Sequence, residues 1–418
     1  MQKKRLLTLL GSICLILVLA ALPFMAACAA PTPTPVAKTL KIGCTLPLNV
    51  GFGVETKKVL EELIIPEFNK AGGLTVKGEK YNIELIIYDD KYAADTGRAA
   101  VEKLVYEDKV KHMVCQAASA SIVAGLVITE QEKVLNLVGG ASPKIVDPGN
   151  HYTFGTSTTR TSIPPVWFMA KKVFPNAKSV VILSPDDETG KASAANDAKT
   201  CKAMGITVID SLFYPRATTD FAPFATKVTT LKPDLVDYAG SAPGTQLGLQ
   251  FRALYEAGYK GNHIASIIPT MQEVLSVAPK EALEGVLVRM PATDIPSPSP
   301  VAKNFKEAYM NKFGTWSIDS LSWIPAWYAF VAAVKKANTL DTEILANMLS
   351  TQGLTWDCPT FEGSLVKRPD LGNTNYCDVV GTCYFGQIKD GKIVYTGTVS
   401  IDDGIAACEQ ALGGGKWK

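Results

Sequence analysis

The sequence lacks an excess of charge of either sign: 42 lysine and arginine residues stand against 40 aspartate and glutamate residues. Proteins that bind nucleic acid through its phosphates carry a basic excess, so we do not expect DNA or RNA as a partner. Charged residues make up 20% and hydrophobic residues 47% of the 418 residues, which excludes a disordered chain and a polytopic membrane protein. At ~100–200 residues per domain, this length predicts at least two lobes.

Catalytic motifs are also lacking. The chain has no G-x-S-x-G elbow, no P-loop, no H-E-x-x-H and no G-x-G-x-x-G after its first strand. Its few histidines lie far apart and are expected at surfaces or strand edges: His112, His151 and His263. Two acid pairs, Asp89-Asp90 and Asp186-Asp187, follow apolar strands, where turn and helix-capping roles are expected rather than glycoside or metal chemistry. We therefore expect no enzyme, no cofactor and no metal.

The amino terminus carries an export signal. Basic residues 3–5 precede an apolar run that ends before Cys28, which is typical of a signal peptide over residues 1–27. The run also has about the ~20 residues of a membrane span, so an uncleaved anchor stays the alternative. The small residues before Cys28 resemble a bacterial lipobox, which predicts lipidation of this cysteine. Residues 28–38 are proline-rich and predict an extended tether.

Without residues 1–27 the chain keeps 39 basic and 40 acidic residues, a balance that suits a neutral or singly charged small ligand. Cys44, Cys115 and Cys201 lie in apolar runs and are expected to be buried free thiols. An oxidising compartment permits one or two disulfides among the four C-terminal cysteines: Cys358, Cys377, Cys383 and Cys408. Zinc is the alternative, but the spacings lack paired C-x-x-C units and no histidine lies near.

Short apolar runs alternate with amphipathic stretches of helical length. Strands are predicted over 40–46, 83–88, 111–115 and 134–138, and in a second series over 179–183, 207–212, 235–238 and 262–266. This alternation indicates parallel sheets covered by helices on both faces. Later helices are predicted over 301–313 and 320–336, and short strands over 361–399. These late segments are too few for a third domain, so the chain should cross between two lobes several times and form a hinge with a cleft.

Two turns with small and hydroxyl-bearing residues follow adjacent predicted strands. Residues 118–121 read Ala-Ser-Ala-Ser and residues 139–142 read Gly-Gly-Ala-Ser. In parallel sheets, ligands bind beyond the carboxyl ends of the strands, where helix N-termini present free N–H groups. Ser119 and Ser142 taken singly are ordinary N-caps. Their paired occurrence predicts a site that binds a carboxylate or an amide.

The order of several short motifs carries a resemblance to a known family. These motifs are Ile42-Gly43 through Pro47-Leu48, residues 69–73, Tyr88-Asp89-Asp90, residues 118–121 and Ala257-Gly258. Together they resemble the leucine/isoleucine/valine-binding proteins, which are type I periplasmic binding proteins that serve ABC transporters. The likeness extends from about residue 40 to 399. It implies an α/β fold of two Rossmann-like lobes with parallel sheets, joined by a hinge of three crossovers around a closing cleft.

The resemblance also implies ligand-binding positions. Ser119 and Ser142, with the neighbouring Ala118 and Ala141, fall where the family binds the ligand carboxylate, and the carbonyl of Gly140 falls where it binds the ammonium. Phe52 replaces a cleft aromatic. Further positions of the cleft are Thr189, Ser241 and Thr270, and they depart from the family pattern. The family's amino-acid binders have tyrosines near the first two and a glutamate near the third, whereas here the nearest acid is Glu273.

Without that glutamate a buried ammonium would lose about 3–5 kcal/mol, so a carboxylic acid, an amide or another small polar metabolite is expected rather than an α-amino acid. Arg160 lies in the interlobe stretch and is expected either to meet a second anionic group or to be a solvated hinge residue. Four aromatic residues late in the chain are expected to pack in the core: Trp316, Trp323, Trp327 and Tyr328. The alternative for one of these four is a position in the cleft.

The sequence thus predicts a lipid-anchored, extracytoplasmic and monomeric solute-binding protein that passes its ligand to an ABC permease in the membrane. The first lobe is expected over residues 39–157 plus 293–354, and the second over 158–292 plus 355–418. A binding protein that signals to a receptor is the first alternative. An exported α/β hydrolase is the second.

Overall fold

The computed structural model describes residues 37–417. The predicted signal peptide (1–27), the lipidation site Cys28 and all but the end of the predicted tether (28–38) lie outside these residues. Within 37–417, no helix combines the length and the hydropathy that a bilayer span requires.

The first lobe is built on a six-stranded sheet with the strand order β2-β3-β1-β4-β5-β6. Strands β1, β4, β5 and β6 run parallel, and β2 pairs with β3 as an antiparallel hairpin at the edge. The strands are β1 (Lys38–Leu46), β2 (Leu74–Val76), β3 (Glu79–Asp89), β4 (His112–Gln116), β5 (Leu135–Val138) and β6 (Thr153–Gly155). Every residue of β4 and β5 is buried, as expected for central strands covered on both faces.

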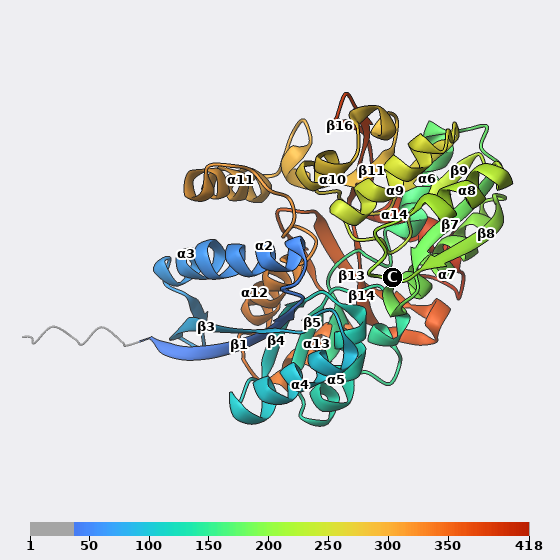
Figure 1. The fold of residues 1–418 in the computed structure, drawn as a ribbon. Coiled ribbons are helices and arrows are strands. Elements are labelled where there is room, and N and C mark those ends of the chain that lie inside the picture. Colours follow the sequence, from blue (N-terminus) through green and yellow to red (C-terminus); the bar gives the residue numbers. More distant parts are fainter. Residues whose placement is uncertain (1–36, 418) are drawn as a thin grey trace, which may run out of the picture. The chain divides into compact units, whose positions relative to one another are not determined.

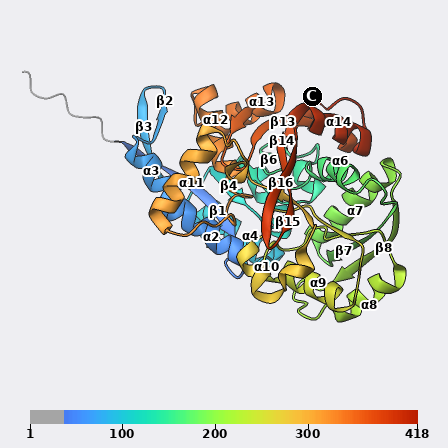
Figure 2. The ribbon, with the colours of Figure 1, turned by 90° about the horizontal axis from the view of Figure 1, so that it is seen from above.

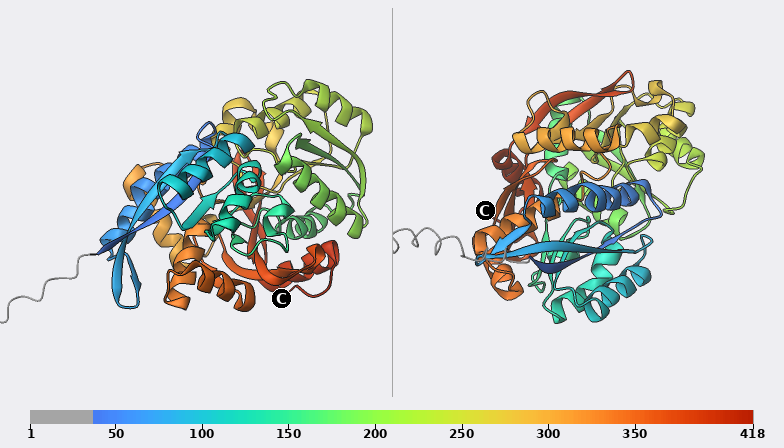
Figure 3. Two further views of the ribbon diagram at one scale, coloured as in Figure 1. Left: turned by 90° about the horizontal axis from the view of Figure 1, so that it is seen from below. Right: turned by 90° about the vertical axis from the view of Figure 1, so that its left-hand side faces the viewer.

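Helices cover both faces of this sheet (Figures 1 and 3). One face packs against α2 (Gly51–Val59), the π-helical turn η1 (Leu60–Ile64), α3 (Ile65–Lys70) and α12 (Pro325–Ala337). The other packs against α4 (Ala94–Glu102), η2 (Lys103–Glu107) and α5 (Ser119–Gln131). In the right-hand view of Figure 3 the blue helices lie above the blue strands and the cyan and teal helices below them.

The second lobe has a seven-stranded sheet with the order β16-β15-β11-β10-β9-β7-β8. The five strands from β8 to β11 are parallel, and β15 and β16 add an antiparallel hairpin. The strands are β7 (Ser179–Pro185), β8 (Thr207–Tyr214), β9 (Leu235–Asp237), β10 (Asn262–Ala265), β11 (Leu287–Met290), β15 (Cys383–Lys389) and β16 (Lys392–Val399). One face carries α6 (Ile163–Val173), α7 (Glu188–Ala203) and α14 (Ile401–Leu412); the other carries α8 (Ala222–Leu231), α9 (Thr245–Glu256) and α10 (Met271–Val277).

The chain passes between the lobes more than once. It leaves the first sheet after β6 and the second sheet after β11, and α11 (Pro300–Phe313), α12 and α13 (Thr342–Gln352) follow. Residues 355–381 then form a three-stranded antiparallel sheet of their own: β12 (Thr355–Asp357), β13 (Glu362–Arg368) and β14 (Asn373–Gly381). Strand β14 packs against β6, and the hairpin β15–β16 returns to the second sheet (Figure 2). The predicted architecture of two α/β lobes joined by several crossovers is confirmed.

Candidate functional site

A cavity of about 820 Å³, counting its solvent-open part, lies between residues of the two lobes. Its walls come from the carboxyl ends of parallel strands and the turns that follow them, the edge at which α/β sheets bind ligands. The first lobe contributes Phe52, Tyr92, Ala117, Gly140, Ala141, Asp319, Ser322 and Trp323. The second lobe and its connecting segment contribute Thr159, Ile163, Thr189, Ser193, Asp197, residues 240–243, residues 266–268 and Arg289.

Half of the predicted site residues line this cavity. Phe52, Gly140, Ala141, Thr189 and Ser241 are part of its wall. Thr270 lines two neighbouring cavities instead, and its hydroxyl donates to Asp319. Four predicted residues are absent from the wall: Ala118, Ser119, Ser142 and Arg160. Glu273 is also absent from the wall of this cavity. It lines a neighbouring cavity, where its carboxylate accepts a hydrogen bond from the amide of Thr245 at 3.1 Å.

The two serine turns do lie together, but their hydroxyls are engaged by the protein. Ser119 Oγ accepts hydrogen bonds from the amides of Ala141 at 2.8 Å and Ser142 at 3.3 Å, so it joins the turn after β4 to the turn after β5. Ser142 Oγ donates to Glu188 Oε1 at 2.6 Å, and Lys144 Nζ lies 3.1 Å from Glu188 Oε2. In the structure the Ser119 hydroxyl joins the two turns, and the Ser142 hydroxyl connects the second turn to α7 of the second lobe.

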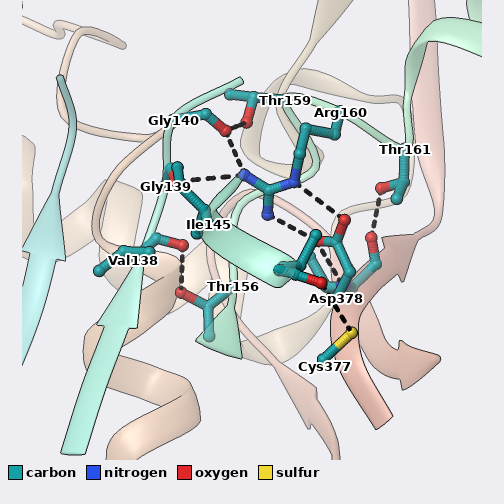
Figure 4. Close-up of polar contacts among 12 residues, drawn as sticks. Val138, Gly139, Gly140, Ile145, Thr156, Thr159, Arg160, Thr161, Cys377 and Asp378 are labelled. Atoms are coloured by element: carbon teal, nitrogen blue, oxygen red, sulfur yellow. Dashed lines mark hydrogen bonds and ion pairs between the residues drawn. The ribbon is translucent and has the colours of Figure 1, made fainter. Parts of the chain in front are cut away.

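The Arg160 guanidinium forms its hydrogen bonds within the protein (Figure 4). Its Nε and Nη2 donate to the two carboxylate oxygens of Asp378 at 2.9 and 2.6 Å, and its Nη1 donates to the carbonyls of Gly139 and Gly140. Its side chain is 2% exposed. Arg160 is thus neither of the two things expected of it, a ligand for an anion or a solvated hinge residue. The Gly140 carbonyl, expected to meet an ammonium, already accepts from Arg160 and from Thr159 Oγ1.

Arg289 is a residue of the cavity that the sequence reasoning missed. It lies on β11, its Nη2 donates to Thr158 Oγ1 at 2.6 Å, and it forms no ion pair with any of residues 37–417. Burial lowers the pKa of Arg289, and no acidic side chain opposes this shift apart from a weak effect of the Cys383 thiol. The cavity therefore contains a buried guanidinium without a counter-ion. The sequence does contain a signal for this residue, since Arg289 is an arginine within the apolar run 286–290.

Two carboxyl groups of the cavity were also missed. Asp197 is completely buried on α7, and Trp167 Nε1 donates to its Oδ1 at 2.5 Å. Burial raises the pKa of Asp197 to about 7. Burial likewise raises the pKa of Asp319, although the hydrogen bond from Thr270 acts in the opposite direction. Burial therefore disfavours the charged form of both carboxyls.

Aromatic rings of the first lobe form the opposite wall. The Phe52 ring lies 5.3 Å from the Trp323 ring between centroids, and 6.2 Å from that of Tyr92 in an edge-on arrangement. Trp323 follows the expectation that one late aromatic reaches the cleft. The remaining three late aromatics pack with the core of the first lobe: Trp316, Trp327 and Tyr328.

The backbone of the two lobes approaches the cavity through similar turns. Gly140 follows β5 with a φ of 80°, and Gly240 follows β9 with a φ of 65°. A side chain in this left-handed region is strained, and a Cβ on Gly240 would lie 2.8 Å from the backbone of Gly190. Both turns need glycine to bring the chain close to the cavity.

The acid pairs and histidines lie outside the cavity wall. Asp187 caps the N-terminus of α7 by accepting from the amide of Gly190, as predicted, and Asp89 accepts from the amides of Leu48 and Lys91 in a turn. His112 is buried and His263 is half-buried, and desolvation lowers the pKa of each to about 4. The burial of His112 corrects the expectation of a surface or edge position.

The four C-terminal cysteines correct the disulfide prediction, because the structure has all of them as free thiols. Each of them is buried, in a different packed cluster: Cys358, Cys377, Cys383 and Cys408. Cys44, Cys115 and Cys201 are buried free thiols, as predicted.

Two wound lobes that share a cavity with polar and aromatic walls define a bilobal solute-binding protein. The sequence profile described as "Periplasmic binding protein" matches residues 42–392, and the chain belongs to this family. The family is one of periplasmic ligand-binding proteins, which implies an extracytoplasmic location.

Individual relatives agree with this assignment. The Leu/Ile/Val-binding protein homolog 8 of Brucella abortus is 26% identical over 298 residues, covering 66% of this chain and 70% of that protein. The leucine-binding protein LivK of Thermotoga maritima has a similar fold, with a TM-score of 0.69 at 19% identity over 87% of this chain and 99% of that one. A solute-binding protein of Rhodopseudomonas palustris BisB5, in complex with 3,4-dihydroxybenzoic acid, also has a TM-score of 0.69, at 23% identity over 87% of this chain and 98% of that one.

Proposed function

We propose that this protein is the solute-binding component of an ABC importer and that its solute is a small organic acid without an α-amino group. The observation that carries this proposal is Arg289, a buried guanidinium in the cleft with no carboxylate partner. Guanidinium and carboxylate groups form paired, charge-assisted hydrogen bonds, and a buried charge without a partner is costly. A solute carboxylate supplies the missing partner.

The position of Ser266 supports the same carboxylate site. Strands β10 and β11 pair Ile264 with Leu287 and Ala265 with Val288, so Ser266 comes beside Arg289 on the neighbouring strand. Ser266 Oγ is buried and has no hydrogen-bond partner, and Ser266 lines the cavity. A carboxylate bound by Arg289 would give this hydroxyl an acceptor.

The aromatic wall supports an acid with a flat or apolar body. Phe52 and Trp323 offer ring faces and edges to a solute, and such contacts contribute about 0.5–1.5 kcal/mol beyond area burial. The 3,4-dihydroxybenzoic acid bound by the Rhodopseudomonas palustris protein is a molecule of this kind. The Thermotoga maritima protein is described as a leucine-binding protein. Leucine is therefore the amino acid to compare with organic acids in a binding test.

Closure of the lobes would bury the solute, with residues 39–157 plus 293–354 moving against 158–292 plus 355–418. Contacts across the cleft support a closed form: Ser142 and Lys144 bind Glu188, and the Arg216 guanidinium lies 4.9 Å from the centre of the Tyr92 ring. Hinge closure around a ligand is a recurrent way to bind solutes. In this proposal the protein is a monomer, is anchored by a lipid on Cys28, delivers the solute to a membrane permease, and catalyses no reaction.

Calorimetry with the purified protein tests the solute class. We expect benzoate and hydroxybenzoates to bind and leucine to bind at least tenfold more weakly, or not at all. Arg289→Met should abolish binding of every acid, whereas Arg98→Met, on the exposed face of α4, should leave affinity unchanged. Tight binding of leucine, or acid binding that survives Arg289→Met, would overturn the proposal.

A further inference from the structure

Arg289 differs from the other arginines of residues 37–417 in the group that holds its side chain. Every other arginine in this range forms an ion pair with a carboxylate: Arg98, Arg160, Arg216, Arg252 and Arg368. Within the same range, the side chain of Arg289 makes a single hydrogen bond, from Nη2 to the hydroxyl oxygen of Thr158 at 2.6 Å. A hydroxyl is a neutral acceptor, so it holds the guanidinium in place and leaves its charge unpaired.

This hydrogen bond fixes a side chain that is otherwise free to rotate. Strand pairing sets the backbone of Arg289, because β11 lies between β10 and β15. Binding a carboxylate through two parallel hydrogen bonds requires the planar guanidinium in one orientation. Nε and Nη1 of Arg289 have no hydrogen-bond partner among residues 37–417, and the residue is 8% exposed and lines the cavity. The contact with Thr158 therefore leaves donors available for a solute.

Thr158 lies where the segments that connect the lobes meet. It belongs to the first crossover, between the end of β6 at Gly155 and the start of α6 at Ile163. Arg289 is the next-to-last residue of β11, after which the chain leaves the second sheet. Gly381 ends β14, just before the chain returns to the second sheet, and a Cβ on Gly381 would lie 2.9 Å from Thr158 Cγ2. Thr158 thus joins the carboxylate site to the hinge.

We infer that Thr158 is a positioning residue, whose hydroxyl aims the Arg289 guanidinium at the carboxylate of the solute and connects it to the hinge. The inference rests on the proposed function, because it takes Arg289 as the group that binds the carboxylate. Thr158 itself is absent from the cavity wall, so it acts through Arg289. A carboxylate at position 158 would pair with Arg289 and cancel its charge, and an apolar side chain would leave the guanidinium without a fixed orientation.

Removal of the hydroxyl tests this role. The probe is the acid, among benzoate and the hydroxybenzoates, that the unaltered protein binds most tightly in calorimetry. Thr158→Val replaces the hydroxyl by a methyl group, and we expect its affinity for this acid to fall at least tenfold. Thr158→Ser keeps the hydroxyl and should bind within threefold of the parent protein. Thr158→Ala differs from Thr158→Ser only by the hydroxyl oxygen and should be as weak as Thr158→Val, so the test does not depend on the folding of the valine variant.

Thr156→Val is the matched control from the same segment. Thr156 is as buried as Thr158, but its hydroxyl donates to the carbonyl of Val138 at 3.2 Å (Figure 4). We expect Thr156→Val to lose stability as Thr158→Val does, and to keep its affinity for the acid within twofold of the parent protein. Thermal unfolding without ligand, followed by circular dichroism, compares the stability of these variants. A loss of affinity confined to the Thr158 variants without a hydroxyl supports the inference.

The other outcomes distinguish this inference from the proposed function. If Thr158→Val and Thr158→Ala bind the acid as tightly as the parent protein and Arg289→Met abolishes binding, the carboxylate site stands and the role of Thr158 falls. The same holds if Thr158→Ser is as weak as Thr158→Ala, or if Thr156→Val loses as much affinity as Thr158→Val. If Arg289→Met still binds the acid, or if no acid of this set binds the parent protein, both proposals fall.

Discussion

Arg160 and Asp378 are 218 residues apart in the sequence and form a two-point ion pair that is almost completely buried, with distances of 2.9 and 2.6 Å. Arg160 belongs to the segment that leaves the first lobe, and Asp378 to β14 of the third sheet. Arg368 Nη1 donates to the same carboxylate at 2.6 Å. One carboxylate thus connects two arginines at the crossovers between the lobes. Burial alone favours its neutral form, but the two arginines keep the pKa of Asp378 below its usual value.

Removing this carboxylate should destabilise the protein strongly. In Asp378→Asn, Arg160 loses its counter-ion in a buried site, and such a loss costs about 3–5 kcal/mol. Denaturant unfolding measures the change. The double variant Arg160→Met/Asp378→Leu removes both charges and should recover part of the loss; a double variant less stable than Asp378→Asn would contradict this account of a buried charge.

A second carboxyl should destabilise the protein when it ionises. Burial raises the pKa of Asp90 to about 6, so the folded state binds its proton more tightly than the unfolded state does. Its effect on stability is therefore unfavourable as pH rises from about 4 to about 6, and constant above that. Asp90→Asn keeps an oxygen for the amide of Tyr92 and has no charge to lose.

The stability of Asp90→Asn relative to the parent protein should increase across this pH range, reaching about 2–3 kcal/mol at pH 7. Urea unfolding at pH 4, 5, 6 and 7 gives the difference at each pH. Asp95→Asn, an exposed position on α4, serves as the control and should show no such trend. A relative stability that is independent of pH would contradict the raised pKa.

Closure should depend on Glu188. Its carboxylate receives the Ser142 hydroxyl and the Lys144 ammonium from the other lobe, and the hydrogen bond from Ser142 lowers the pKa of Glu188. Because these contacts join the lobes, Glu188→Gln should weaken benzoate or hydroxybenzoate binding by about three- to tenfold, mainly through faster dissociation.

Asp186→Asn is the neighbouring control for this prediction. Asp186 pairs with Lys191 within the second lobe, at 2.6 Å, so its removal should leave the dissociation rate unchanged. Stopped-flow tryptophan fluorescence measures both variants. Equal dissociation rates in Glu188→Gln and the parent protein would show that this contact does not stabilise the closed form.

Thiol labelling tests the cysteines. Burial raises the pKa of every thiol in the described part of the chain, so none should react with iodoacetamide in the folded protein. In denaturant without a reductant all of them should react, as peptide mass mapping would detect. A C-terminal pair that reacts only after reduction would restore the disulfide that the sequence predicted.

The fold could be predicted from the sequence because the central strands are buried on both faces and read as apolar runs between helical repeats. Strand β11 was not predicted from the sequence, because it has only four residues and Arg289 interrupts their apolar run. The short strands β2 and β6 were missed for a similar reason, as three residues give too little periodicity to detect.

The candidate site could be predicted only in part. The turns after β4 and β5 were located correctly because small residues after a buried strand have few other uses. Which of their groups remain free for a ligand depends on partners distant in sequence: Glu188 takes the Ser142 hydroxyl, and Asp378 takes the Arg160 guanidinium. We propose Arg289 as a site residue because of the opposite property, the absence of a carboxylate partner among the described residues, which no local sequence pattern reveals.

The two lobes contribute different kinds of side chain to the cavity, and this difference predicts the order of the steps in solute binding. The charged and hydrogen-bonding groups that we assign to the solute lie on the second lobe, and the aromatic rings lie on the first. An open molecule would capture its guest on the second lobe by electrostatic attraction, at a rate that falls as salt is added. The first lobe, which carries the aromatic rings, would then close over the solute. The dissociation rate of the solute would depend on how often this lobe opens.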